Sequence, residues 1–204
     1  MTAGFNDSLL LDAIRNCAQC QDLSLGPRPI LQWQRDARIL IAGQAPGRLT
    51  HEKGVPFDDP SGDRLRGWLG VDRATFYDPG IFAIVPMAFC YPGTGQSGDL
   101  PPPSVCAQLW RNRLLGPMQS LELTIIVGQY AAAWHYPDEK GALTGLVCRW
   151  KKTFPAMVVL PHPSPRNRMW LSRNPWFEAD LVPHLRERVA GILAAMRPSV
   201  QDPL

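Results

Sequence analysis

The sequence has no apolar run long enough to cross a membrane. A spanning helix needs about 20 consecutive apolar residues, and no stretch of the 204 residues approaches that length. The first seven residues, Met-Thr-Ala-Gly-Phe-Asn-Asp, also lack the basic start and apolar stretch that are typical of a secretory signal. We therefore expect a cytoplasmic protein without a membrane anchor, whose cysteine thiols stay reduced.

Internal repeats and low-complexity linkers are missing too, so nothing in the sequence divides the chain. Its length suits a single domain over residues 1–204, and an apolar fraction of 45% can supply a core. Charge is unevenly placed: residues 1–106 carry 9 basic and 11 acidic side chains, and residues 107–204 carry 12 and 7. The resulting net charges of −2 and +5 favour a surface in the second half that faces a polyanion.

Four short apolar runs are present, and turn residues bound each of them. The runs cover residues 38–42, 82–85, 123–127 and 157–160. Patterns typical of helices cover residues 8–16, 64–69, 105–115, 130–134 and 178–196. Continuous apolar runs that alternate with helices predict an α/β fold with a parallel sheet covered on both faces.

The segments that follow these runs carry the functional signal. They read Gly-Gln-Ala-Pro-Gly from residue 43, Met-Ala-Phe-Cys-Tyr-Pro-Gly from residue 87, Gly-Gln-Tyr-Ala from residue 128, and Pro-His-Pro-Ser-Pro-Arg-Asn from residue 161. In an open parallel sheet, ligands bind outside the carboxyl ends of the strands. The sequence therefore predicts that four polar, glycine- or proline-rich loops meet at one site.

His162 is the clearest catalytic candidate. Prolines on both sides stiffen its backbone, and it follows a predicted strand. A lone imidazole there could simply hydrogen-bond a nearby carbonyl group. Because Ser164, Arg166, Asn167 and Arg168 follow closely, the segment also offers a donor for developing negative charge and several phosphate contacts. This grouping favours a functional interpretation.

Three stretches in a fixed order are typical of one family. They are Gly-Gln-Ala-Pro-Gly (43–47), Gly-Val-Pro-Phe (54–57) and His-Pro-Ser-Pro (162–165). Together they resemble the uracil-DNA glycosylase superfamily over about residues 17–190, and their spacing is most similar to its iron–sulfur class, type 4. The resemblance implies a three-layer α/β/α sandwich around a four-stranded parallel sheet, in agreement with the apolar runs.

Five cysteines need their own explanation. Cys17 and Cys20 form a C-x2-C pair, whereas Cys90 and Cys106 stand apart. Core thiols or a zinc ion held by four thiolates are alternatives, although a zinc ribbon more usually has two C-x2-C pairs. One pair with two separate cysteines resembles the type 4 enzymes, which implies a [4Fe–4S] cluster with a structural role on these four residues. We expect Cys148 to be a small buried apolar residue.

The same resemblance implies roles for the other motif residues. Phe57 would stack on a base extruded from the DNA, and Gly43, Gln44 and Ala45 would lie against that base. His162 would donate a hydrogen bond to the departing base. Phosphates near the lesion would be held by the segment after it: Ser164, Arg166, Asn167 and Arg168.

This chain departs from the type 4 pattern at the positions expected to orient the attacking water. Gln44 stands where those enzymes have Glu, and Thr50 stands where they have a second acidic residue. Ala45, as in the type 4 class, stands where several other relatives have the aspartate that positions water. His51 or Glu52 could orient water instead, by their position alone.

A further departure concerns the base itself. Relatives read the edge of uracil with an Asn four residues before the third cysteine, but Pro86 occupies this position. Proline has neither a side-chain amide nor an N–H to offer. Either another group, such as Gln44 or the backbone, compensates, or the preferred base is not uracil.

The leading prediction is a monomeric DNA glycosylase. It would hydrolyse the N-glycosidic bond of uracil or a related deaminated base in DNA, and so start base excision repair. The alternative is a catalytically weak member of the same fold that binds damaged or single-stranded DNA. A redox protein with a metal cluster is disfavoured, because no flavin or nucleotide signature is present.

Overall fold

The computed structural model describes residues 6–96, 98–139 and 141–196, which surround a four-stranded parallel sheet. The strand order is β2 (Phe82–Ile84), β1 (Ile39–Ala42), β5 (Leu123–Val127) and β6 (Met157–Leu160). Every neighbouring pair runs parallel. Each strand lies within one residue of a predicted apolar run, so the prediction of a parallel α/β sheet is confirmed.

The other elements range from long helices to single turns. In chain order they are α1 (Asp7–Arg15), α2 (Arg48–Lys53), α3 (Pro60–Leu69), α4 (Arg73–Phe76), β3 (Thr94–Gly95), β4 (Gly98–Asp99), α5 (Ser104–Leu115), α6 (Gln129–His135), α7 (Leu143–Cys148), η1 (Trp150–Lys152), η2 (Pro165–Asn167), α8 (Arg168–Arg173), η3 (Phe177–Leu181) and α9 (Val182–Met196). None of the described helices is long and apolar enough to cross a membrane.

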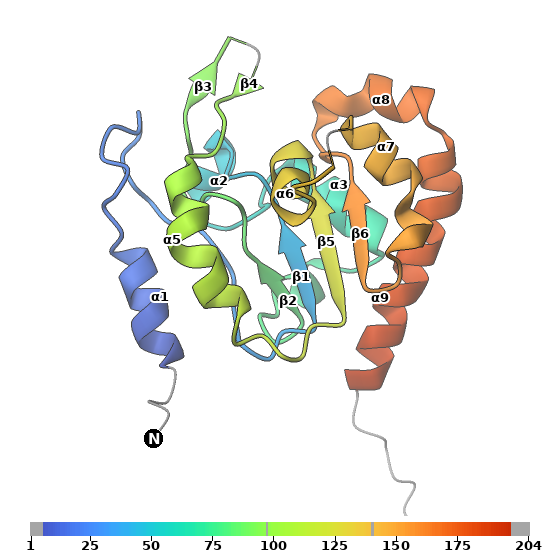
Figure 1. Cartoon of the computed structure of the whole chain (residues 1–204), viewed down its shortest axis with the longest axis horizontal. Helices are drawn as coiled ribbons and strands as arrows, with labels where there is room; N and C mark the ends of the chain where they lie inside the picture. The colour runs from blue at the N-terminus through green and yellow to red at the C-terminus, as the bar shows by residue number, and fades with distance from the viewer. Residues whose placement is uncertain (1–5, 97, 140, 197–204) are drawn as a thin grey trace, which may run out of the picture.

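The sheet is buried on both faces, because successive side chains of a strand point to opposite sides. Ile39 and Ile41 of β1 pack in one core with α3 and α9, whereas Leu40 packs in a second core with α1 and α5. Figure 1 shows α1 and α5 on one side of the strands and α9 on the other. The predicted three-layer α/β/α arrangement is therefore confirmed.

The helices differ from the prediction in three ways: a capping residue moves one helix start, one predicted helix divides, and several short helices were not predicted. Helix α3 begins earlier than expected, because the Asp59 side chain accepts a hydrogen bond from the Gly62 N–H at 2.8 Å and Pro60 suits the first turn. The predicted helix 178–196 divides into η3, a π-helical turn, and α9. Helices α2, α4, α7 and α8 were not predicted, because so few residues give no periodic pattern.

One edge of the sheet gathers the loops that follow the strands. The arrowheads of the strands point to this edge in Figure 1, and the β3–β4 hairpin stands beside it. The hairpin is antiparallel and pairs Thr94 with Asp99. Any site built from the strand ends is thus also open to residues of the hairpin.

Candidate active site

A cleft of about 710 Å³ opens at this edge. This volume is within the range of sites for small organic ligands. The cleft brings together most of the site residues expected from the sequence: Gly43, Gln44, Ala45, Phe57, His162, Ser164, Arg166 and Asn167. It also includes Gln129 and Tyr130 from the third loop. Segments after all four strands line the cleft, because Pro86 after β2 also contributes, and this convergence follows from the parallel sheet.

The glycine-rich loop after β1 forms one wall, and its backbone is tied to the segment after β2. The Gly43 carbonyl accepts a hydrogen bond from the Met87 N–H at 2.9 Å, and the Gln44 carbonyl accepts one from the Ala88 N–H at 3.1 Å. Gln44 Nε2 lies 3.4 Å from the Leu100 carbonyl oxygen. These bonds fix the wall before any ligand enters.

Phe57 presents an aromatic ring from a strained position in the cleft. Its φ is 55°, which is unusual for a residue other than glycine. A Cβ on Gly43 would lie 3.5 Å from the ring, and a Cβ on Gly62 would lie only 1.7 Å from the Phe57 carbonyl oxygen. The loop therefore packs directly onto the first turn of α3, and only glycine fits at residue 62.

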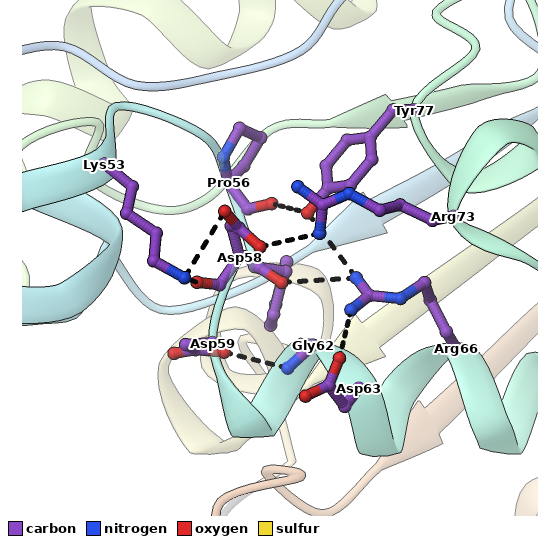
Figure 2. A network of polar contacts seen from close by, with 10 residues as sticks. Lys53, Pro56, Asp58, Asp59, Gly62, Asp63, Arg66, Arg73 and Tyr77 are labelled. Carbon is purple, nitrogen blue, oxygen red and sulfur yellow. Dashed lines mark hydrogen bonds and ion pairs between the residues drawn. The ribbon is translucent and has the colours of Figure 1, made fainter.

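A polar network holds the backbone around Phe57. Figure 2 shows Asp58 between Arg73 and Lys53, at 2.6 and 3.4 Å from their side-chain nitrogens. The hydrogen bond from Arg73 holds the pKa of the Asp58 carboxyl below its usual value. Arg66 donates to the Phe57 carbonyl at 3.3 Å, and the Tyr77 hydroxyl donates to the Pro56 carbonyl at 2.9 Å. Such cross-links allow a strained conformation to persist.

Hydrogen bonding fixes the tautomer of His162. The Ser164 N–H donates to His162 Nδ1 at 3.2 Å. A neutral ring must then carry its hydrogen on Nε2. Burial lowers the pKa of His162, while the nearby Asp59 and Asp99 carboxylates act in the opposite direction. The cleft therefore contains a neutral imidazole with its N–H at Nε2.

Neighbouring side chains position the segment that carries His162. Asn167 Nδ2 donates to the His162 carbonyl at 2.7 Å, and Arg64 from α3 donates to the Ser164 carbonyl at 2.9 Å. The Ser164 hydroxyl accepts from the Arg166 N–H at 3.2 Å. Ser164 and Asn167, expected to contact phosphates, thus also stabilise the loop.

The two basic residues of this segment lie differently. Arg166 is exposed and lines the cleft, and a Cβ on Gly98 of the hairpin would lie 2.8 Å from its Nη1. Arg168 is exposed at the start of α8 and is outside the cleft lining. Both are open to a polyanion, but only Arg166 reaches the ligand space.

The two residues expected to orient water lie outside the cleft lining. His51 is only 8% exposed, and the burial that lowers its pKa also separates it from solvent. Its backbone carbonyl accepts a hydrogen bond from Arg28. Glu52 points to solvent and pairs with Arg48 at 3.0 Å. Their position in the sequence suggested this role, but helix α2 directs both side chains elsewhere.

Two carboxylates missed by the sequence analysis line the cleft instead. Asp59 follows Phe57 by two residues, and Asp99 is on the β3–β4 hairpin. Both act electrostatically on His162. Asp59 could have been suspected from its closeness to Phe57. Asp99 gave no signal, because it lies between two cysteines in a segment interpreted only as a cluster loop.

Apolar residues line the part of the cleft where an asparagine was expected. Pro86, Ile84 and Ile30 contribute to this wall. The carbonyl groups of Val85 and Pro86 accept hydrogen bonds from the buried Arg111 at 2.6 and 3.3 Å. The wall at residue 86 is thus fixed in place and provides no amide side chain.

The four cysteines of the expected cluster line a second cavity, which is formed by the segment after α1, the segment after β2 and the start of α5. Cys17, Cys20, Cys90 and Cys106 all contribute to it. Burial raises the pKa of Cys106 to about 12 and raises those of Cys20 and Cys90. In the described part of the chain, no three His, Cys, Asp or Glu side chains form a group that could hold a metal ion.

The thiols that line this cavity are the type of donor that iron–sulfur clusters bind. Four sulfur atoms from three segments reach it, and the indole N–H of Trp110, which also lines it, is buried without a partner among the described residues. Cys148 is exposed and lies elsewhere, so its expected burial was wrong. Cys17, Cys20, Cys90 and Cys106 thus line one cavity without forming a metal-holding group in this structure, and the cluster stays a prediction.

Comparison with known proteins identifies the relatives of this chain. The family described as "Uracil DNA glycosylase superfamily" matches residues 32–186. A solution NMR structure of a "putative Uracil DNA glycosylase" from Methanosarcina acetivorans is also similar, at 17% identity, over 79% of this chain and 97% of that one. Its TM-score to this chain is 0.45. The family match includes the cleft loops and His162.

Proposed function

Because the chain belongs to the uracil DNA glycosylase superfamily, we propose that it hydrolyses the N-glycosidic bond of a deaminated base in DNA. Uracil is the first candidate, and its release would start base excision repair. One observation carries the proposal: His162 is held with its N–H at Nε2 in a cleft that also contains the Phe57 ring. This pairing provides an aromatic face for an extruded base and a donor for its developing charge.

The chemistry follows from charge separation in the transition state. As the C1′–N bond breaks, its electron pair moves onto the base and the sugar becomes positive. The His162 Nε2–H would donate to a carbonyl oxygen of the base as that oxygen becomes negative. Because the ring is neutral, it needs no proton from solution, and its donor is already oriented by the Ser164 N–H.

DNA would approach over the basic segment that borders the cleft. Arg166 and Arg168 are exposed on this segment, and residues 107–204 have a net charge of +5 from 12 basic and 7 acidic side chains. Phosphate contacts of this kind give affinity without reading sequence. The extruded nucleotide would then enter the cleft beside Phe57.

A [4Fe–4S] cluster would be held by Cys17, Cys20, Cys90 and Cys106. When bound, it supplies a cross-link between the end of α1, the segment after β2 and the start of α5. The hydrolysis itself requires only the residues of the cleft.

A DNA-binding protein with little catalysis is the second candidate, because Pro86 lines the cleft where a base-reading amide was expected. Incubation with single-stranded and double-stranded oligonucleotides containing uracil, hypoxanthine or xanthine, followed by alkali cleavage, separates the two candidates. Release of any of these bases supports the glycosylase. Binding without release from every substrate would support the alternative.

A further inference from the structure

The cleft needs a group that handles water, and the loop expected to provide it has none. Gln44 and Ala45 carry no charge, and His51 and Glu52 are outside the cleft lining. Of the described residues that line the cleft, only Asp59 and Asp99 are acidic. The question is which of these two carboxylates is free to act.

Asp59 already has a structural partner. Its Oδ1 accepts a hydrogen bond from the Gly62 N–H at 2.8 Å and caps α3. Capping of this kind stabilises a helix by about 1 kcal/mol. Asp59 therefore stabilises the junction between the Phe57 loop and α3, although its charge still acts on His162 in the cleft.

Asp99, unlike Asp59, has a side chain that neither caps a helix nor accepts a hydrogen bond from the described residues. Its side chain makes no hydrogen bond or ion pair with the described part of the chain. A Cβ on Gly47 would lie 3.5 Å from Asp99 Oδ2, so the carboxylate rests against the glycine-rich loop. The hairpin thus delivers an unpaired acid onto the loop that lacks one.

We propose that Asp99 is a catalytic residue that orients the attacking water and whose negative charge stabilises the positive sugar. This inference rests on the proposed glycosylase function. The β3–β4 hairpin would thus supply the water-orienting carboxylate that the glycine-rich loop lacks.

The step balances without any further reactant. The C1′–N bond breaks and its electron pair leaves with the base, which later takes a proton from solvent. The water oxygen forms a bond to C1′, and one water proton passes to the Asp99 carboxylate and then to solvent. The products are the free base and an abasic site.

Charges around Asp99 determine its pH dependence. Asp99 is exposed overall, yet partial burial of its carboxyl raises its pKa, and Asp59 adds to this effect. The Arg166 guanidinium acts in the opposite direction, and so does the His162 ring when it is protonated. The carboxylate is the active form, so the rate should rise with pH through the raised pKa of Asp99.

The test compares single-turnover release in unmodified protein, Asp99→Asn and Asp99→Glu, using oligonucleotides with uracil, hypoxanthine or xanthine over a range of pH. Asp99→Asn should lower the rate by about 100-fold or more and remove the acid limb, with unchanged DNA affinity and melting temperature. Asp99→Glu should restore part of the rate. Asp72→Asn, an exposed cap of α4, is the matched control and should behave as unmodified protein.

The outcomes separate this inference from the proposed function. An active unmodified protein with an equally active Asp99→Asn variant would overturn the role of Asp99 alone. The same holds if Asp99→Asn lowers the rate but keeps the acid limb, because the carboxylate is then not the titrating group. If the unmodified protein releases none of the bases, the proposed function and the role of Asp99 both fail.

Discussion

The proposed chemistry of the cleft depends on one hydrogen-bond donor, the Nε2–H of His162. The Ser164 N–H occupies Nδ1, and burial lowers the pKa of the ring, so the neutral tautomer with Nε2–H dominates near neutral pH. Its loop is held by Asn167 and Arg64. A donor oriented in this way costs no reorganisation when charge appears on the base.

Replacing His162 by Ala should lower single-turnover base release by about 100-fold or more, because one preorganised donor is removed. Affinity for DNA should stay nearly the same, since the donor acts on charge present only in the transition state. His184→Ala, on the exposed side of α9, is the control. Full activity in His162→Ala would contradict the mechanism.

A second imidazole, that of His135, should make the stability of the fold depend on pH. Burial and the adjacent Arg111 lower the pKa of His135 to about 4, and Arg111 donates to its Nε2 at 3.1 Å. The unfolded chain, with a pKa of about 6.5, binds the proton first as pH falls. His135 therefore costs stability increasingly below about pH 6.5, in the window between the two pKa values.

Chemical denaturation at pH 7.5 and pH 5 measures this effect. The folded protein should lose about 2 kcal/mol through His135 over this interval. His135→Gln retains an acceptor for Arg111 and removes the titration, so the pH dependence should become shallower by that amount. An identical dependence in both proteins would show that His135 is not the group responsible.

At the scale of elements, α3 connects the two halves of the cleft. Gly62 in its first turn and Arg66 further along the helix support the Phe57 loop, and Arg64 on the same helix holds the His162 segment. The aromatic platform and the catalytic imidazole therefore share one rigid support.

A pair of glycine substitutions in α3 tests this dependence. Gly62→Ala places a Cβ 1.7 Å from the Phe57 carbonyl oxygen, so the loop must move. We expect a loss of about 1–3 kcal/mol in unfolding free energy, together with weaker binding of the extruded base. A Cβ on Gly67 of the same helix meets nothing within 4 Å. Gly67→Ala should stabilise by about 0.5–1 kcal/mol, and equal effects of the two changes would contradict the packing.

The basic segment after β6 should determine DNA affinity. Arg166→Gln and Arg168→Gln together should weaken binding to all sequences similarly. The slope of affinity against salt should fall by roughly one unit for each phosphate that is no longer neutralised. Arg15→Gln on α1, which is exposed and outside the cleft lining, is the control. An unchanged salt slope in the double variant would place the DNA surface elsewhere.

At the scale of the molecule, the cysteine cavity connects segments that are far apart in sequence. We expect purified protein to be brown, with about four iron and four sulfide per chain. Cys17→Ala and Cys106→Ala should remove the colour and lower the melting temperature. Cys148→Ala should change neither, because Cys148 is exposed and outside the cavity. A colourless protein with one zinc ion would exclude the cluster and leave the fold unaffected.

Much of this architecture could be predicted from the sequence by itself. The four strands appear as continuous apolar runs, because strands covered on both faces have no polar alternation. The cleft residues follow these runs, because parallel strands end at one edge of the sheet. For this reason Gly43, His162 and Arg166 could be identified from the sequence, Phe57 was added by the family resemblance, and all four lie together in the cleft.

Only the tertiary structure decided which acidic and basic side chains enter the cleft. Helix α2 buries His51 and turns Glu52 to solvent, whereas the β3–β4 hairpin brings Asp99 against Gly47. A local pattern records whether a residue is buried or lies in a loop. It does not record which distant segment lies opposite, because that depends on how the packed layers position each loop.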